Sequence, residues 1–318
     1  MNIFGITSDL KIIPASDLDT NQKNKFSLMA NEDERLFAKS LQELDKCSVS
    51  KHKIRLVDKD CAPIYTAPYR ISEKERNFLR DEIDKMIEAK VVRPSRSPWS
   101  SPVVVISKFF FQIKLNHEIF YVLFQKLKLK IVNFKSNNTL FFLRKSDKSM
   151  RVCIDYRQLN TITHTEKWPI PDRRDIFDRL RDSAWFTLFD LKSGYYQIEM
   201  DLESMDKTAF STPDSHYEYL VLPFGLKNAP IDFSRVIKEI LGCLIKFVEA
   251  FIEDITIHSK TFEENLEHIK IVLNRLKKEK LKLNPDKCVW CAKSVKILGH
   301  IISKNEVRMD PSKNKSHF

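Results

Sequence analysis

Acidic residues interrupt two apolar runs of the sequence, and these acids are the strongest candidates for a catalytic or metal-binding role. Asp190 ends the run Trp185-Phe186-Thr187-Leu188-Phe189, and the pair Glu253-Asp254 separates Phe251-Ile252 from Ile255-Thr256-Ile257. A carboxylate in an apolar strand costs free energy unless it has a partner, and hard oxygen ligands suit Mg²⁺. One interpretation is therefore a shared metal site. The other is a strand end at Asp190 and a solvated hairpin turn at Glu253-Asp254, because turns favour acidic residues.

Five motifs help to decide between these two interpretations. Four of them lie around the acids, and the fifth lies near the end of the chain. They are, in order, Arg151-Val152-Cys153-Ile154-Asp155-Tyr156-Arg157-Gln158-Leu159-Asn160, Phe189-Asp190-Leu191-Lys192-Ser193-Gly194-Tyr195-Tyr196-Gln197-Ile198, Lys207-Thr208-Ala209-Phe210, Leu222-Pro223-Phe224-Gly225-Leu226-Lys227-Asn228-Ala229-Pro230 and Ile297-Leu298-Gly299-His300-Ile301. In that order they resemble the reverse transcriptases of gypsy-type (Metaviridae) LTR retrotransposons. The resemblance spans residues 51–108 and 145–310.

The resemblance implies a fold and a set of site residues. The fold would be α+β, the fingers and palm of a right-hand polymerase, with an antiparallel palm sheet covered by helices on one face. Asp190, Glu253 and Asp254 would be the catalytic and metal-binding acids. The remaining assignments are dNTP binding by Arg151, Tyr195, Phe224 and Gly225, and a primer grip at Leu298, Gly299 and His300.

The chemistry of phosphodiester formation agrees with these assignments. It needs two Mg²⁺ ions about 4 Å apart, with Mn²⁺ as a substitute, to activate the primer 3′-hydroxyl and hold the triphosphate. The rest is positioning and charge neutralisation, which gives Arg151 a role on the phosphates. Tyr195 beside Gly194 can crowd the sugar 2′ position, which separates DNA from RNA precursors. Taken alone, Tyr195 is better explained as a core aromatic.

We therefore expect an RNA-directed DNA polymerase, a nucleotidyltransferase of a retrotransposon Pol polyprotein that extends a primer with dNTPs on an RNA or DNA template. The alternative is a catalytically decayed copy that only binds nucleic acid. That alternative rests on Glu253 and Phe251, since the family has Tyr-x-Asp-Asp where this chain has Phe251-Ile252-Glu253-Asp254. Glu249 adds to it, because an unpaired carboxylate in this apolar run would destabilise the palm.

Composition and cysteine usage limit the other classes of function. The 54 Lys+Arg against 43 Asp+Glu give a net charge of +11, which favours a polyanionic partner. The five glycines exclude a dinucleotide fingerprint or a P-loop. The six cysteines lack the dense spacing of a disulfide-stapled domain, which favours a reducing compartment. Cys288-Val289-Trp290-Cys291 is a lone CxxC, better explained by a core pair than by zinc.

Targeting and membrane-spanning signals bear on the cellular location of the protein. Met1 to Leu10 lacks the charged and apolar regions of a signal peptide, and no stretch resembles a charge-free membrane span. We expect an intracellular protein, in the cytoplasm or the nucleus, without a membrane partner. Residues 311–318 are expected to be a truncated tail, with the family's RNase H and integrase regions absent.

Helices and strands are predicted from periodicity, caps and turn residues. Residues 1–50 are expected to be a linker or the tail of a preceding module, and 51–310 the fingers and palm. Helices are predicted over residues 31–44, 73–90, 172–181, 230–244 and 261–279, the second starting at a capping box formed by Ser72 and Glu75. Strands are predicted over residues 103–106, 151–155, 185–191 and 295–302.

Residues 109–144 form an atypical insertion, without Gly or Pro and with a single acid, Glu118. One explanation is translated non-coding sequence such as a retained intron, because A/T-rich codons specify the Phe, Lys, Asn, Ile, Tyr and Leu that dominate it. The other is a genuine fingers insertion that binds template through its lysines, Lys114, Lys126, Lys128, Lys130 and Lys135.

Overall fold

The computed structural model describes residues 15, 18–30, 34–106, 110–112, 130–131, 140–144, 150–169, 172–252 and 254–311. Its helices are α1 (Thr20–Ala30), η1 (Glu34–Leu36), α2 (Glu73–Glu88), α4 (Arg157–Ile162), α5 (Arg173–Leu180), η2 (Gly194–Gln197), α6 (Leu202–Met205), η3 (Asp206–Thr208), α7 (Ala229–Leu241), η4 (Gly242–Leu244) and α8 (Phe262–Lys278). Its strands are β1 (Lys51–His52), β2 (Val92–Pro94), β3 (Ser101–Ile106), β4 (Phe110–Gln112), β5 (Lys130–Ile131), β6 (Leu140–Arg144), β7 (Arg151–Ile154), β8 (Trp185–Asp190), β9 (Glu199–Met200), β10 (Phe210–Ser211), β11 (His216–Tyr219), β12 (Val248–Phe251), β13 (Asp254–Ser259), β14 (Val289–Ala292), β15 (Ser294–Ile297), β16 (His300–Ser303) and β17 (Glu306–Met309).

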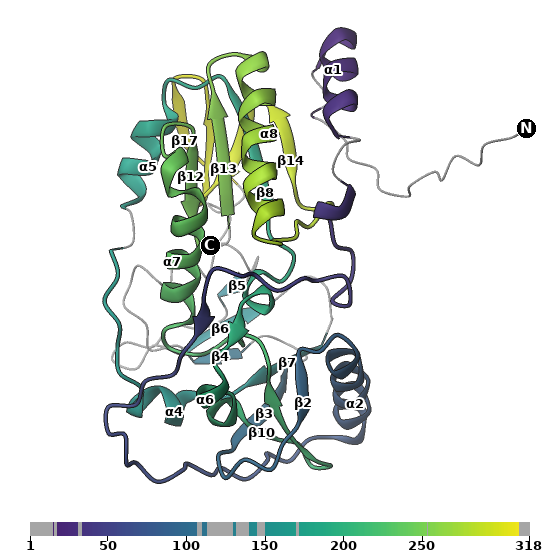
Figure 1. Cartoon of the computed structure of the whole chain (residues 1–318), viewed down its shortest axis with the longest axis vertical. Helices are drawn as coiled ribbons and strands as arrows, with labels where there is room; N and C mark the ends of the chain where they lie inside the picture. The colour runs from purple at the N-terminus through teal and green to yellow at the C-terminus, as the bar shows by residue number, and fades with distance from the viewer. Residues whose placement is uncertain are drawn as a thin grey trace, which may run out of the picture.

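The palm sheet is the four-stranded antiparallel sheet β12-β13-β8-β14, in the upper half of Figure 1. Side chains alternate between the two faces of a strand, and those of Trp185 and Thr187 in β8 meet α8. The Trp185 ring lies 5.1 Å from the Phe262 ring, and Thr187 donates a hydrogen bond of 2.9 Å to Asn265. Asp190 is therefore on the opposite face. The expected α+β fold with an antiparallel palm sheet is confirmed, and α8 covers the face of the sheet that carries Trp185.

The opposite face of the palm sheet packs against α5 and the three-stranded sheet β15-β16-β17. The single strand predicted over residues 295–302 is wrong, because it is two strands joined by a two-residue turn. Leu298 and Gly299 form this turn with φ values of 48° and 81°. Two positive φ values in a row are the geometry of the tight turn that suits a twisted hairpin.

The fingers sheet is the five-stranded sheet β2-β11-β10-β3-β7, in the lower half of Figure 1 beside α2. The predicted capping box at the start of α2 is confirmed. The Glu75 amide donates to Ser72 Oγ at 3.3 Å, and the Ser72 amide donates to Glu75 Oε2 at 2.8 Å. The apolar face of α2 buries Leu79, Ile83 and Met86, as the helical spacing predicts.

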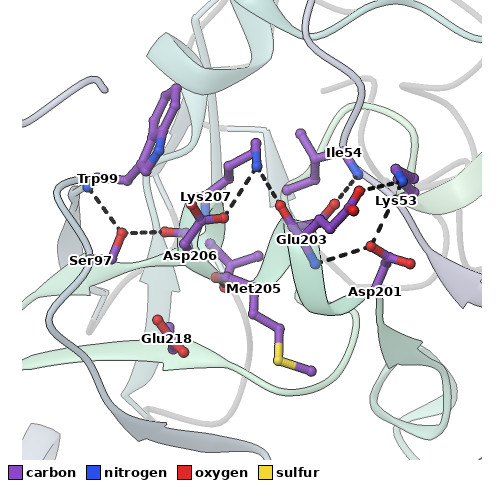
Figure 2. A network of polar contacts seen from close by, with 12 residues as sticks. Lys53, Ile54, Ser97, Trp99, Asp201, Glu203, Met205, Asp206, Lys207 and Glu218 are labelled. Atoms are coloured by element: carbon purple, nitrogen blue, oxygen red, sulfur yellow. Dashed lines mark hydrogen bonds and ion pairs between the residues drawn. The ribbon is translucent and has the colours of Figure 1, made fainter. Parts of the chain in front are cut away.

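A polar network around α6 and η3 connects three segments of the chain (Figure 2). Lys53, which follows β1, donates to Glu203 at 2.7 Å. On the other side Ser97, in the connection from β2 to β3, donates to the Asp206 carbonyl at 2.7 Å and accepts from the Trp99 amide at 3.0 Å. Segments from three separate parts of the sequence thus converge at this network.

The N-terminal segment packs more closely than expected. The helix predicted over residues 31–44 is wrong, because within the described residues 34–44 the chain forms only the short η1, and the longer helix is α1. Residues before position 50 were expected to be a linker or tail, yet Phe26 and Phe37 are buried against Trp290, with ring centroids 5.7 and 6.0 Å apart. The Leu283 amide also donates to the Leu36 carbonyl at 2.7 Å. These contacts join distant positions, so local periodicity does not reveal them.

Only short pieces of the atypical insertion are described. They form a small antiparallel sheet, β4-β6-β5, whose β5 contains Lys130. The other four lysines proposed to bind template, and residues 312–318 of the tail, lie outside the described residues. Within the described part of the chain, no helix has the length and apolarity needed to cross a bilayer.

Candidate active site

Asp190 and Asp254 face each other across neighbouring strands. They are the last residue of β8 and the first of β13, and the register of the two strands pairs them directly. Directly opposed residues have Cβ atoms about 4.5–5.5 Å apart, and two like charges in such a pair destabilise a sheet. The Asp190 side chain keeps 20% of its surface exposed. The pair therefore offers a half-buried concentration of negative charge that a cation would stabilise.

The turn that carries Asp254 is short and strained. Phe251 pairs with Asp254, so two residues connect β12 to β13. The first of them, Ile252, has φ 55°, a conformation that is a genuine outlier for a β-branched residue. Such strain costs on the order of 1–3 kcal/mol and persists where surrounding structure enforces it. The second residue, Glu253, lies outside the described residues, so its assignment as a catalytic acid stays a prediction.

The predicted primer-grip residues lie beside this turn. Leu298 is buried in the same apolar cluster as Phe251, and Ile252 packs against that cluster. His300 Nδ1 lies 3.2 Å from the Leu298 carbonyl oxygen, while the Gly299 carbonyl accepts a 3.0 Å hydrogen bond from the Asp310 amide. The structure thus brings together two tight turns, one carrying Asp254 and the other the primer-grip residues.

Lys287 places an ammonium group beside Asp190. Its Nζ lies 3.3 Å from Asp190 Oδ1 and 3.5 Å from Oδ2, and the Asn284 amide donates to the Asp190 carbonyl at 2.8 Å. The sequence did not single out Lys287. The available signal was a lysine in the turn Asn284-Pro285-Asp286-Lys287 immediately before an apolar strand.

Two of the predicted dNTP-binding residues, Tyr195 and Phe224, are in contact with each other. Tyr195, in η2, is 7% exposed and stacks on Phe233 with ring centroids 5.0 Å apart and planes inclined by 15°. The Phe224 ring is 4.7 Å from Tyr195 but 49% exposed. The Tyr195 ring therefore packs as a core aromatic does, with Phe224 between it and solvent.

Asn160 holds the loop that contains Gly225. Its Nδ2 donates to the Gly225 carbonyl and its Oδ1 accepts from the Lys227 amide, both at 2.8 Å. Gly225 has φ +96°, and a Cβ there would lie 3.5 Å from the carbonyl oxygen of Ile154, the last residue of β7. β7 begins at Arg151, so the predicted triphosphate arginine lies on a strand that ends next to this loop. Asn160 was part of a quoted motif without a role of its own.

Removing the Asn160 side chain tests whether this loop binds dNTP. Each lost hydrogen bond contributes about 1 kcal/mol, so Asn160→Ala, which loses two, is expected to raise the KM for dNTP by up to about 30-fold, with a smaller change in kcat. Asn160→Asp keeps the acceptor for Lys227 and loses the donor to Gly225, so it should fall between Ala and wild type. Steady-state primer extension measures both parameters. A loss of kcat at unchanged KM would contradict a role in dNTP binding.

Glu249 is paired, contrary to the expectation of an unpaired carboxylate. It is 5% exposed, and Arg179 of α5 donates to it from Nε at 2.5 Å and from Nη2 at 2.8 Å. This two-pronged geometry suits a planar guanidinium. The expectation was wrong because the partner is 70 positions away in the sequence. The palm therefore accommodates the charge of Glu249, and this residue is no longer a reason to expect a destabilised fold.

Removing the arginine of this pair should destabilise the protein. Arg179→Met leaves a buried carboxylate without its donors, at a cost of roughly 1–3 kcal/mol. The double variant Arg179→Met with Glu249→Met should recover much of that loss, because it leaves no buried charge. Denaturant unfolding measures both. A double variant as unstable as Arg179→Met would show that packing of the arginine, rather than charge, is what matters.

The cysteines of the CxxC motif are free thiols. Burial raises the pKa of both Cys288 and Cys291 to about 12, and the Cys291 amide donates to Thr187 Oγ1 at 3.0 Å. Thiolates are the form that binds metal, and burial disfavours that form of both groups in the metal-free protein. Among the residues that the structure describes, which exclude Glu253, no three His, Cys, Asp or Glu side chains gather as a metal site.

Comparison with known proteins places this geometry in a family. Residues 143–302 match the family model described as reverse transcriptase (RNA-dependent DNA polymerase). The retrovirus-related Pol polyprotein from transposon 297 of Drosophila melanogaster is 33% identical over 303 residues, which are 93% of this chain and 25% of that protein. That from transposon gypsy of the same organism is 30% identical over 264 residues, 83% of this chain and 22% of that protein. The chain thus spans about a quarter of the length of these curated relatives.

Solved structures agree on the fold. The foamy viral protease-reverse transcriptase in complex with an RNA/DNA hybrid superposes with a TM-score of 0.75 at 17% identity, over 94% of this chain and 35% of that one. The same viral protein in complex with double-stranded DNA gives a TM-score of 0.75 over 94% of this chain and 55% of that one. At this identity the likeness concerns the fold alone, and the predicted fingers and palm are confirmed.

Proposed function

Because the chain belongs to the reverse transcriptase (RNA-dependent DNA polymerase) family, we propose that it is the fingers and palm of a retrotransposon Pol polyprotein and extends a primer 3′-hydroxyl with dNTPs. The observation that carries the proposal is the direct pairing of Asp190 with Asp254 at the ends of β8 and β13. A template of RNA or DNA is the proposed partner, in line with the net charge of +11.

The acid pair fits a divalent cation. Two carboxylates on the same face of adjacent strands repel each other unless positive charge lies between them, and carboxylate oxygens are the ligands that Mg²⁺ or Mn²⁺ take. Asp190 and Asp254 would hold the ions, with Glu253 as the proposed third ligand. When bound, two such ions activate the primer hydroxyl and neutralise charge on the triphosphate.

The other residues would act by binding and orienting the substrates. Arg151 would neutralise the triphosphate, and the exposed ring of Phe224 with Gly225 would form the dNTP loop. Tyr195, fixed by its stacking on Phe233, would lie next to Phe224 and limit the space available to the nucleotide sugar. The turn at Leu298, Gly299 and His300 would hold the primer end beside Asp254. Positioning of this kind can supply about 7–11 kcal/mol of the barrier reduction.

A primer-extension assay on the purified chain tests the proposal. We expect template-dependent extension on RNA and on DNA templates with Mg²⁺ or Mn²⁺, and loss of extension when EDTA removes the metal. A filter-binding measurement on the same primed templates runs in parallel. Binding without extension under every metal condition would contradict the polymerase and leave a nucleic-acid-binding fragment.

A further inference from the structure

The ammonium of Lys287 approaches both oxygens of the Asp190 carboxylate. The two distances, 3.3 and 3.5 Å, are nearly equal, so the positive charge lies in the fork of the carboxylate and not at one end of it. Asp254 is the directly opposed residue on the neighbouring strand. Lys287 therefore supplies positive charge at the place where the two acids need it.

A divalent cation and this ammonium compete for the same oxygens. Mg²⁺ takes oxygen ligands at about 2.0–2.1 Å and keeps part of its water shell, which leaves little room for an ammonium in the same fork. Their like charges also repel. The Lys287 side chain is 63% exposed and sits on a flexible four-carbon stem, so it can withdraw into solvent when a metal ion arrives.

We propose that Lys287 is a built-in counterion of the metal site, which neutralises Asp190 in the metal-free protein and sets the metal concentration that the site requires. The inference rests on the proposed function, since it needs a metal site at Asp190. Ion pairs between exposed partners are weak, and the strength typical of them corresponds to a change in metal affinity of roughly 1.5- to 5-fold.

Metal binding without nucleotide or nucleic acid is the direct test. Mn²⁺ is titrated into the full chain and followed by the electron paramagnetic resonance signal of the free ion, with Mg²⁺ as a competitor. Lys287→Met removes the charge at similar length, and Lys287→Arg keeps it. Lys304→Met is the matched control, because it removes one exposed positive charge from the connection between β16 and β17, at the far end of β16 from the primer-grip turn.

The expected result is tighter Mn²⁺ binding by Lys287→Met, roughly 1.5- to 5-fold, with Lys287→Arg and Lys304→Met close to wild type. The gain should shrink in high salt, which screens exposed charges, and it should vanish when Asp190→Asn is also present. In melting experiments, saturating Mn²⁺ should raise the Tm of Lys287→Met more than that of wild type, because the metal-free variant lacks its counterion.

Several outcomes would overturn the counterion. One is an unchanged Mn²⁺ affinity in Lys287→Met, and another is an equal gain of Mn²⁺ affinity in Lys304→Met. A third is loss of dNTP affinity in Lys287→Met at unchanged Mn²⁺ affinity, which would make Lys287 a triphosphate ligand. Failure of the proposed function looks different. In that case the wild-type protein would show no Mn²⁺ site that Asp190→Asn removes, and the proposed role of Lys287 would be wrong as well.

Discussion

Primer extension by the Asp190→Asn variant is expected to fall roughly 10³-fold or more below wild type. Asn has nearly the shape of Asp but carries no charge, so the substitution removes a metal ligand while preserving the strand end. A metal ion supplies several kcal/mol of transition-state stabilisation, and each 1.36 kcal/mol is a factor of ten in rate. Asp254→Asn should behave alike, because the same register places it opposite Asp190. Single-turnover extension with saturating primer-template measures the loss.

The control for this experiment is Asp182→Asn, an exposed acid in the connection from α5 to β8. It removes one negative charge without touching the acid pair, and extension should stay within about twofold of wild type, since surface substitutions have small effects. Circular dichroism and thermal melting should show Asp190→Asn folded. If Asp190→Asn retained more than about a tenth of wild-type extension, the acid pair could not be the reaction centre.

The parts of the fold that the sequence predicted are those specified by local interactions. Helix α8 was predicted over residues 261–279 and spans Phe262–Lys278, because its capping residues Thr261 and Glu264 lie within one turn of each other. Strand β8 was predicted over residues 185–191 and spans Trp185–Asp190. In both cases the residues that define the element are neighbours in the sequence, so a short window contains the whole signal.

The interactions that escaped prediction join distant positions. Asp190 and Lys287 are 97 residues apart, and Arg179 and Glu249 are 70 apart. Which side chain meets a given carboxylate depends on the register of strands and the packing of α5, neither of which a local window determines. The pairing of Asp190 with Asp254 is of the same kind. The motifs indicated that both acids matter, whereas their direct opposition follows only from the strand register.

Local preference and observed conformation disagree most clearly at the two turns beside the acid pair. Ile252 and Leu298 both have positive φ values, 55° and 48°, although neither residue type favours that conformation. Propensity alone therefore fails at Ile252, and the predicted continuous strand over residues 295–302 failed at Leu298. Such conflicts concentrate at sites where geometry is selected over stability. Leu298 belongs to the apolar cluster against which Ile252 packs, so both conflicts lie close to the location proposed for the reaction centre.

The variant Glu253→Asp is expected to raise primer extension, the opposite of most active-site substitutions. The family resemblance places a shorter carboxylate at this position, so Glu253 carries its charge one methylene further from the backbone. A misplacement of about 1 Å at a reacting centre can cost on the order of 10²-fold, which sets the largest expected gain. The connection from Phe251 to Asp254 has only two residues, and Asp is better suited than Glu to such tight turns. Single-turnover extension in Mg²⁺ and in Mn²⁺ measures the gain.

Deletion of residues 109–144 separates a defect of the metal site from a defect of the fold. The deletion leaves residues 107–108 and 145–150 to connect the end of β3 to the start of β7, and these strands already pair in antiparallel orientation. If the insertion is translated non-coding sequence, the deletion should raise soluble yield and Tm while leaving Mn²⁺ affinity unchanged. Glu253→Asp in that background should then show its full gain, because a misfolded fraction no longer masks it. If neither change, alone or combined, produces any extension of a primed template, the active polymerase is excluded and only the family membership stands.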